Sequence, residues 1–188
     1  NGDTWTRTTF IDFPVDRYII DSGIDLDTNG ILDQVYSTDQ SGSLLIDNNG
    51  MVHIFVGNMA FSDDDLADGG WSWYPYTNGL LYWNESMGQD NTPATIDPNY
   101  PDIWYSNNMQ VIAGSQDIDG DSIIQLDGYA IYYMSLSSMP SSGIDEDGHI
   151  YVSYSAVMEG ISNGAQNFRH VNLIKSTDGG NSWSCPLD

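Results

Sequence analysis

The chain has 188 residues, 40% of them hydrophobic and 12% aromatic, so it can bury a core of ordinary size and is not disordered in composition. Its 27 acidic residues face only four basic ones, and the net charge of −23 at pH 7 argues against nucleic acid and anionic membranes as partners. No apolar run approaches the roughly 20 residues of a membrane-spanning helix, so we expect no membrane insertion.

An acidic loop is the first chemical signal along the chain, after a strand expected at 17–21. The stretch "DLDTNGILD" matches the head of a D-x-[DN]-x-[DN]-G loop, in which oxygen ligands wrap Ca²⁺ and a glycine permits the bend. Its ligand positions are taken by Asp25, Asp27, Asn29, Asp33 and the carbonyl of Ile31. Because Tyr36 stands where an EF-hand has its glutamate, we expect a shorter Ca²⁺ loop, with a solvated turn as the alternative.

Aromatic residues are dense between residues 71 and 83, where they include Trp71, Trp73, Tyr74, Tyr76 and Trp83. Flat apolar rings beside amide side chains suit stacking on sugars, and exposed rings also mark protein contact sites. We therefore interpret this segment as a candidate surface for binding a glycan or a surface protein. The alternative is that the rings cover the hydrophobic edge of a sheet.

Two further acidic stretches are weaker metal candidates. In "DIDGD", at 117–121, the glycine comes too early for the Ca²⁺ template. The stretch "SDDDLADGG", at 62–70, fits no ligand template, and we expect it to be a solvated loop.

Two hairpins repeat along the chain, in "LLIDNNGMVHIFVGN" and in "SGIDEDGHIYVSYSA". Asp47 and Gly50 of the first occupy the same relative positions as Asp145 and Gly148 of the second. Each pattern predicts a strand, an Asp-x-x-Gly turn and a second strand, because the acid caps the turn and the glycine takes the positive φ. Third strands are expected at 79–86 and 169–176, and a strand is also expected before the second hairpin, at 129–135.

Two units of four antiparallel strands would fill the chain, one over residues 1–100 and the other over 101–188. Tandem four-stranded units predict an all-β fold of β-propeller blades. Because two blades cannot close a ring, we expect the rest of a longer chain, or other subunits, to complete it. An independent β-sandwich with coincidentally similar turns is the alternative.

The stretch "STDGGNSW" at 176–183 places Ser176, Asp178, Gly180 and Trp183 in a fixed order. This stretch resembles the Asp-box, or BNR repeat, of sialidase-like β-propellers, and "NGDTW" at 1–5 resembles the end of another copy. The resemblance implies a structural turn at the outer rim of a blade, between its third and fourth strands. In such a turn the acid and the hydroxyl are occupied by hydrogen bonds and the tryptophan packs beneath, so the motif does not locate a functional site.

Catalysis is not predicted for this chain. The resemblance to sialidases implies three arginines, a tyrosine activated by a glutamate and an acidic aspartate, but only Arg7, Arg17 and Arg169 are present and no Arg-Ile-Pro stretch occurs. We expect a non-catalytic binding or scaffolding segment of a secreted or cell-surface protein, similar to acidic bacterial propellers and stabilised by Ca²⁺. The alternatives are part of a sialidase-like glycoside hydrolase whose catalytic residues lie elsewhere, and a subunit of an extracellular assembly.

Overall fold

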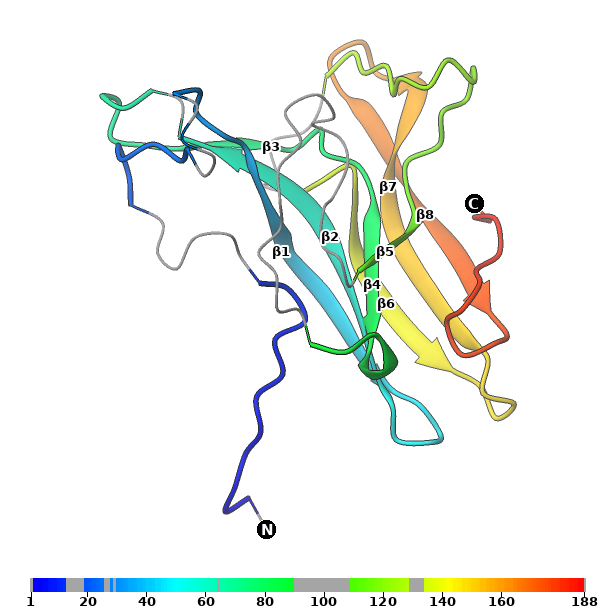
Figure 1. Ribbon diagram of the computed structural model, residues 1–188. Helices are drawn as coiled ribbons and strands as arrows, with labels where there is room; N and C mark the ends of the chain where they lie inside the picture. Colours follow the sequence, from blue (N-terminus) through cyan, green and yellow to red (C-terminus); the bar gives the residue numbers. More distant parts are fainter. Residues whose placement is uncertain are drawn as a thin grey trace.

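The computed structural model describes residues 2–12, 19–25, 28, 30–63, 65–89, 109–128 and 134–187 (Figure 1). Over these residues the protein is all-β, with antiparallel strands in two sheets and one short 3-10 turn, which confirms the predicted fold class at this level. Most of the strand expected at 129–135 and residues 17 and 18 of the one expected at 17–21 lie outside the described residues, and residues 19–21, 134 and 135 are not in strands. Within the described ranges no helix is long and apolar enough to cross a bilayer.

The first sheet holds five strands in the order β1-β2-β4-β5, with β3 paired to the end of β2. The 3-10 turn Glu85–Met87 follows β4. The predicted boundary placed residues 110–113 in the second unit, but they form β5 and pair with β4, so the first sheet extends past that boundary. The strands are β1 Val35–Ile46, β2 Val52–Ser62, β3 Ser72–Tyr74, β4 Leu80–Asn84 and β5 Gln110–Ala113.

The second sheet holds three strands in the order β6-β7-β8. They are β6 Ser137–Ile144, β7 Ile150–Ser162 and β8 Asn167–Ser176. After β8 the chain turns back, and Leu187 forms an antiparallel bridge with Leu173 while Ser184 N donates to Lys175 O. The C-terminal segment, drawn in red in Figure 1, therefore runs beside β8 as a fourth strand would.

The same turn joins β1 to β2 and β6 to β7. Asp47 accepts hydrogen bonds from the backbone N–H groups two and four residues on, and Asp145 does the same. Gly50 and Gly148 have φ values of 84° and 83°, a conformation that side chains with a Cβ rarely adopt. The predicted hairpins are thus present, and the acid and the glycine have the roles that the sequence assigns to them.

The two sheets pack face to face around one apolar core. The first sheet contributes Phe55, Leu80 and Tyr82, and the second contributes Ile150, Val152, Tyr154, Ala156 and Ile174. At one side of this core β1 lies along β6, where Ser43 Oγ and Ser142 Oγ are 2.7 Å apart. Burial of these apolar side chains is the main stabilising contribution to the contact between the sheets.

Opposite faces of the two corresponding sheets meet at this core. Phe55 of β2 faces the second sheet, but its counterpart in the repeat, Ser153, alternates with Val152 and so lies on the outward face of β7. Conversely, Val152 faces the first sheet, whereas its counterpart Ile54 packs on the other side of β2. A sandwich with two-fold symmetry would bring equivalent faces together. Here the equivalent faces of the two sheets point in the same direction, so the sheets are stacked head to tail.

The remaining face of the first sheet carries a second apolar cluster, formed by Tyr36, Val56, Ala60 and Leu81. Phe10 and Ile11 from the N-terminal segment pack against this cluster. The strand β2 is therefore covered by apolar contacts on both of its faces, as expected for an inner sheet of a layered fold.

Candidate functional site

The turn after β8 is closed by its own polar side chains. Ser176 Oγ donates to Asp178 at 2.8 Å and accepts from Gly180 N at 2.8 Å. Asp178 also accepts from the N–H and the hydroxyl of Ser182, at 2.9 and 2.6 Å. The hydrogen bonds from Ser182 and Ser176 lower the pKa of Asp178 to about 2. Because these groups are occupied in holding the turn, none of them is available as a catalytic or binding group.

Trp183 connects this turn to the first sheet. Its ring makes edge contacts with Phe55 and Tyr82, at centroid distances of 5.8 and 5.2 Å, and Gly180 lies directly against Tyr82. The partial copy of the motif at the N-terminus behaves differently, because Trp5 is 89% exposed. Trp5 therefore does not pack beneath a sheet in the way that Trp183 does.

A buried polar network lies beneath the turn. The Tyr82 hydroxyl is 2.8 Å from His53 Nδ1 and accepts from Asn84 Nδ2, also at 2.8 Å. All three side chains are buried, and this burial lowers the pKa of His53 and raises that of Tyr82. A neutral histidine sealed from solvent has access to no substrate, so the network positions Tyr82 in the interface between the sheets.

The predicted Ca²⁺ loop is described only in part, since Asp27 and Asn29 lie outside the described residues. Asp25 accepts a hydrogen bond from Gly30 N at 2.9 Å, and Asp33 N donates to the backbone before the loop. The side chain of Ile31 is exposed and carries no oxygen, so only its backbone carbonyl could be a ligand.

A buried carboxylate anchors the segment that leads into this loop. Asp63, at the end of β2, accepts hydrogen bonds from Ser22 N and Gly23 N at 3.0 and 2.9 Å. This places the loop at the end of the first sheet that also carries β3.

The second acidic loop, at 117–121, lies beside a further possible metal ligand that the sequence did not indicate. Asp117, Asp119 and Glu159 each offer a carboxylate oxygen, and these oxygens lie within 4.8 Å of one another. Glu159 comes from β7, far along the chain, and is 4% exposed. Its two oxygens accept from Ile118 N at 2.5 Å and Gln125 N at 2.8 Å, so the glutamate also holds the loop in place. The loop at 117–121 was a weaker Ca²⁺ candidate in sequence than the loop at 25–33. It nevertheless has the more complete set of possible ligands among the described residues.

The electrostatics differ between the carboxylates of this cluster, since hydrogen bonds from Ser122 N and Gly120 N lower the pKa of Asp117. The hydrogen bond from Asp121 N alone would lower the pKa of Asp119, but desolvation and repulsion by the neighbouring carboxylates together raise it. A divalent cation bound to these oxygens would offset the repulsion between the carboxylates around Asp119.

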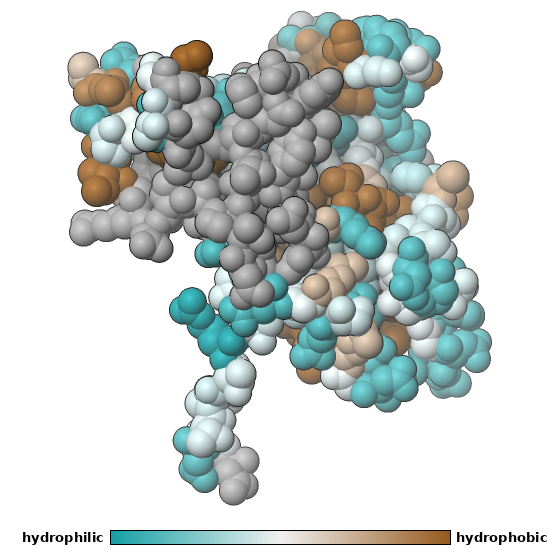
Figure 2. All heavy atoms as spheres, viewed as in Figure 1, coloured by the Kyte–Doolittle hydropathy of each residue, from teal (hydrophilic) through white to brown (hydrophobic). Residues whose placement is uncertain are grey.

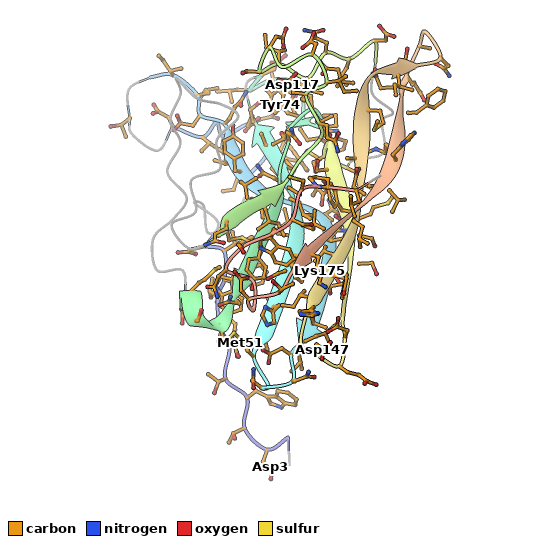
Figure 3. The ribbon with its side chains drawn as sticks, turned by 90° about the vertical axis from the view of Figure 1, so that its right-hand side faces the viewer. Asp3, Met51, Tyr74, Asp117, Asp147 and Lys175 are labelled. Carbon is orange, nitrogen blue, oxygen red and sulfur yellow. The ribbon has the colours of Figure 1, made fainter. Side chains whose placement is uncertain are left out.

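A third group of possible ligands occurs at the β6–β7 turn, where Asp145, Asp147 and His149 come together. Asp145 is already occupied, because it accepts from the N–H and the ring of His149 and from the hydroxyl of Tyr151. Burial would raise the pKa of Asp145, but these bonds lower it to about 2. This group serves the hairpin. It lies at the opposite end of the molecule from Asp117, as Figure 3 shows.

The predicted aromatic surface is divided by the fold. Trp83 is buried and its indole N–H donates to Gly88 O at 2.9 Å, so its ring is not offered to a ligand. Trp71 packs against Phe61 and Trp73, with ring centroids 5.1 Å apart in both pairs. Three of the five predicted rings are thus occupied by contacts within the sheet region.

Tyr74 and Tyr76 lie at the open end of the first sheet. The Tyr74 hydroxyl bonds to Ser62 Oγ at 2.7 Å, and its ring makes an edge contact with Tyr76. Tyr76 is 45% exposed and lines a cleft of about 760 Å³ between β5 and the second acidic loop. Ile123, from that loop, forms part of the opposite wall of the cleft.

The arginines do not form an anion-binding centre within the described residues. The guanidinium of Arg169 donates to the backbone carbonyls of Ser135, Leu136 and Ser155, so it braces β8 against its neighbours. Arg7 lies in the exposed N-terminal segment, and Arg17 lies outside the described residues.

Comparison with known proteins adds a distant structural likeness. No protein-family model matches the chain, and neither does any curated protein. Among solved structures, the chain is similar to a crystal structure of a protein of unknown function from Dyadobacter fermentans DSM 18053, with a TM-score of 0.39 and 16% identity over 78% of this chain. The match covers 35% of that protein, so this chain spans about a third of its length.

Proposed function

We propose that the chain is a Ca²⁺-stabilised, non-catalytic binding or scaffolding segment of a sialidase-like Asp-box β-propeller that is secreted or exposed on a cell surface. The observation that carries the proposal is the head-to-tail stacking of two similar sheets, pinned by the Asp178 turn. When opposite faces of two sheets meet, further sheets can stack in the same way. Such repeated stacking forms a closed ring when the rotations between successive sheets add up to a full turn. Further sheets, from a longer chain or from other subunits, would then cover the outward faces.

The Asp-box supports the family assignment through its position. The turn lies between β8, the third strand of its sheet, and the segment at 184–187 that runs back beside it. Trp183 packs inward against Phe55 of the neighbouring sheet. A rim turn between third and fourth strands is the position that the resemblance implies.

Ca²⁺ is proposed at two loops. One is formed by Asp25, Asp27, Asn29, Ile31 and Asp33, and the other by Asp117, Asp119 and Glu159. In the second loop the buried Glu159 already fixes the backbone on either side of the acidic turn, so an ion would bind a preformed site at little ordering cost. The cleft beside this loop, with Tyr76 on its wall, is the proposed contact surface for a glycan or a surface protein.

Calorimetric and thermal titrations with Ca²⁺ test the proposal. We expect Ca²⁺ at about 100 times its Kd to stabilise the protein by about 2.7 kcal/mol for each occupied loop, which raises Tm by roughly 5–11 °C per loop. The variant Glu159→Gln should lose the part of this increase that comes from the second loop. Glu146→Gln is the matched control, because Glu146 is exposed in the distant β6–β7 turn.

Two outcomes decide between the parts of the proposal. If the wild-type protein shows neither heat of binding nor a Tm shift with Ca²⁺, the metal is not part of the function. If Ca²⁺ binds but a panel of glycans gives no heat in its presence or in chelator, the segment is a scaffold and the cleft is not a carbohydrate site.

A further inference from the structure

The cleft between β5 and the second acidic loop has walls that are mostly aliphatic. Two exposed apolar side chains stand on opposite walls, Val111 of β5 at 60% exposure and Ile123 of the loop at 62%. The other apolar residues that line the cleft are Ile112, Ala113, Ile124 and Leu136. Exposed aliphatic side chains on both walls of a cleft mark it as a contact site for apolar groups.

Asn78, a polar residue of the cleft wall, has its side-chain amide already in use. Its Oδ1 accepts from Gly79 N at 2.8 Å, from Ser115 N at 2.9 Å and from the Ser137 hydroxyl at 3.0 Å. A sugar that entered the cleft would lose hydrogen bonds to water and gain few in exchange, which costs free energy. Of the two ligand classes proposed above, these walls therefore favour a protein segment with apolar side chains over a glycan.

The cleft runs along the outer edge of β5. Successive side chains of a strand point to opposite faces, yet the four consecutive residues 111–114 all line the cleft, so it reaches both faces of the strand. The strand β4 pairs with one edge of β5, and within the described ranges no strand pairs with the other. The N–H and C=O groups of such an edge can bond a further strand.

The loop that forms the other wall is acidic. Asp119 and Asp121 are exposed and come just before the wall residues 122–124. At this end of the molecule, at the upper right of Figure 2, hydrophilic residues (teal) lie beside hydrophobic ones (brown). A bound Ca²⁺ would not reverse the charge, because the carboxylates of Asp117, Asp119, Asp121 and Glu159 outnumber its positive charges.

Basic residues in the described part of the chain do not neutralise this wall. The guanidinium of Arg169 reaches the backbone of Leu136, but it is occupied there by three carbonyl oxygens. Lys175 lies at the end of β8 beside the start of β7, whereas Glu159 lies near the end of β7. Arg7 lies in the N-terminal segment, which runs away from the end that carries the loop (Figure 1). A partner segment with lysine or arginine is therefore attracted to the loop, and an acidic segment is repelled.

We propose that the cleft binds an extended segment of a partner protein, in which apolar side chains alternate with lysine or arginine, as an added strand on β5. The apolar side chains pack between Val111 and Ile123, and the backbone bonds to the outer edge of β5. The alternate basic side chains lie toward the carboxylates of the loop. This inference rests on the proposed function and names the class of partner that the cleft accepts.

Fluorescence anisotropy of labelled probe peptides, titrated with the full chain, tests the inference. We expect a short capped peptide of alternating lysine and valine to bind, and its affinity to fall as salt is added. A glutamate–valine peptide should not bind, because the loop repels it. The lysine–valine peptide with every backbone nitrogen methylated should not bind either, because it cannot donate hydrogen bonds to β5.

Lysine substitutions on the two walls locate the site. Val111→Lys and Ile123→Lys should each raise the Kd of the lysine–valine peptide by about tenfold or more. Val171→Lys is the matched control, because Val171 is 68% exposed in β8 but does not line the cleft. It should bind the peptide like wild type. Circular dichroism checks that every variant is folded.

A folded wild-type chain that does not bind the lysine–valine peptide would overturn the inference. So would equal binding of the methylated peptide, equal Kd values for Val111→Lys and Val171→Lys, or binding of a glycan that Val111→Lys abolishes. Ca²⁺ titration of the same samples separates this result from the proposed function. Peptide binding without any effect of Ca²⁺ contradicts the metal sites alone, and a Ca²⁺-stabilised chain that does not bind the peptide contradicts the added strand alone.

Discussion

Replacing Gly180 by alanine should destabilise the protein far more than a surface substitution does. Gly180 is buried with a φ of 93°, and a Cβ there would collide with the hydroxyl end of Tyr82. The Tyr82 ring is fully buried and its hydroxyl is held by His53 and Asn84, so it has no room to move aside. Backbone strain contributes about 1 kcal/mol and overpacking about 1–3 kcal/mol, which together give a loss of about 3 kcal/mol.

Thermal unfolding followed by tryptophan fluorescence measures this loss. For a chain of this length about 3 kcal/mol lowers Tm by roughly 6–12 °C. Gly179→Ala is the control, because Gly179 also has a positive φ, of 71°, but nothing lies within 4 Å of an added Cβ. It should lose only the strain of about 1 kcal/mol. Equal losses in the two variants would refute the contact between the turn and Tyr82.

Two further predictions concern pH. The folded pKa of Asp178, about 2, is below its unfolded value of 3.8, so its contribution to stability should be lost as pH falls from about 4 to about 2. Urea midpoints of Asp178→Asn should change less with pH in that window. Burial lowers the pKa of His53, so the unfolded chain takes up a proton first and stability should fall as pH drops below 6.5. A His53→Phe variant whose midpoints keep the wild-type slope between pH 7 and 5 would contradict this.

Local signals predicted the two hairpins and the polar turn after β8. An acid and a glycine at fixed spacing specify a turn within a few residues, whatever the rest of the chain does. The turns of Asp47, Asp145 and Asp178 are all of this kind, and their hydrogen bonds lie within four residues of the acid.

Contacts between distant segments could not be predicted in this way. Nothing near Glu159 in sequence indicates that it meets Asp117, because the contact depends on where β7 lies in the folded chain. The strand β5 was missed for a related reason, since it pairs with β4 across a long connection. The burial of Trp83 likewise depends on the packing of the first sheet and not on its aromatic neighbours in the sequence.

One signal for the stacking was present in the sequence. Both faces of β2 carry apolar residues, with Phe55 on one side and Ile54 and Val56 on the other. Such a pattern indicates a sheet that is covered on both sides. It does not say which face meets the second unit, because that choice depends on the geometry of the connection between the sheets.

An engineered disulfide tests the central claim, that opposite faces of the two sheets meet, most directly. Ser43 Oγ and Ser142 Oγ are 2.7 Å apart, so sulfur atoms at these positions can reach bonding distance with small rotations. In a Cys185→Ser background, Ser43→Cys with Ser142→Cys should oxidise to an intramolecular cross-link, measured by thiol titration and mass. Leu44→Cys with Ser142→Cys, on the opposite face of β1, should remain reduced. Cross-linking of the Leu44 pair but not the Ser43 pair would show that equivalent faces meet and would contradict the account.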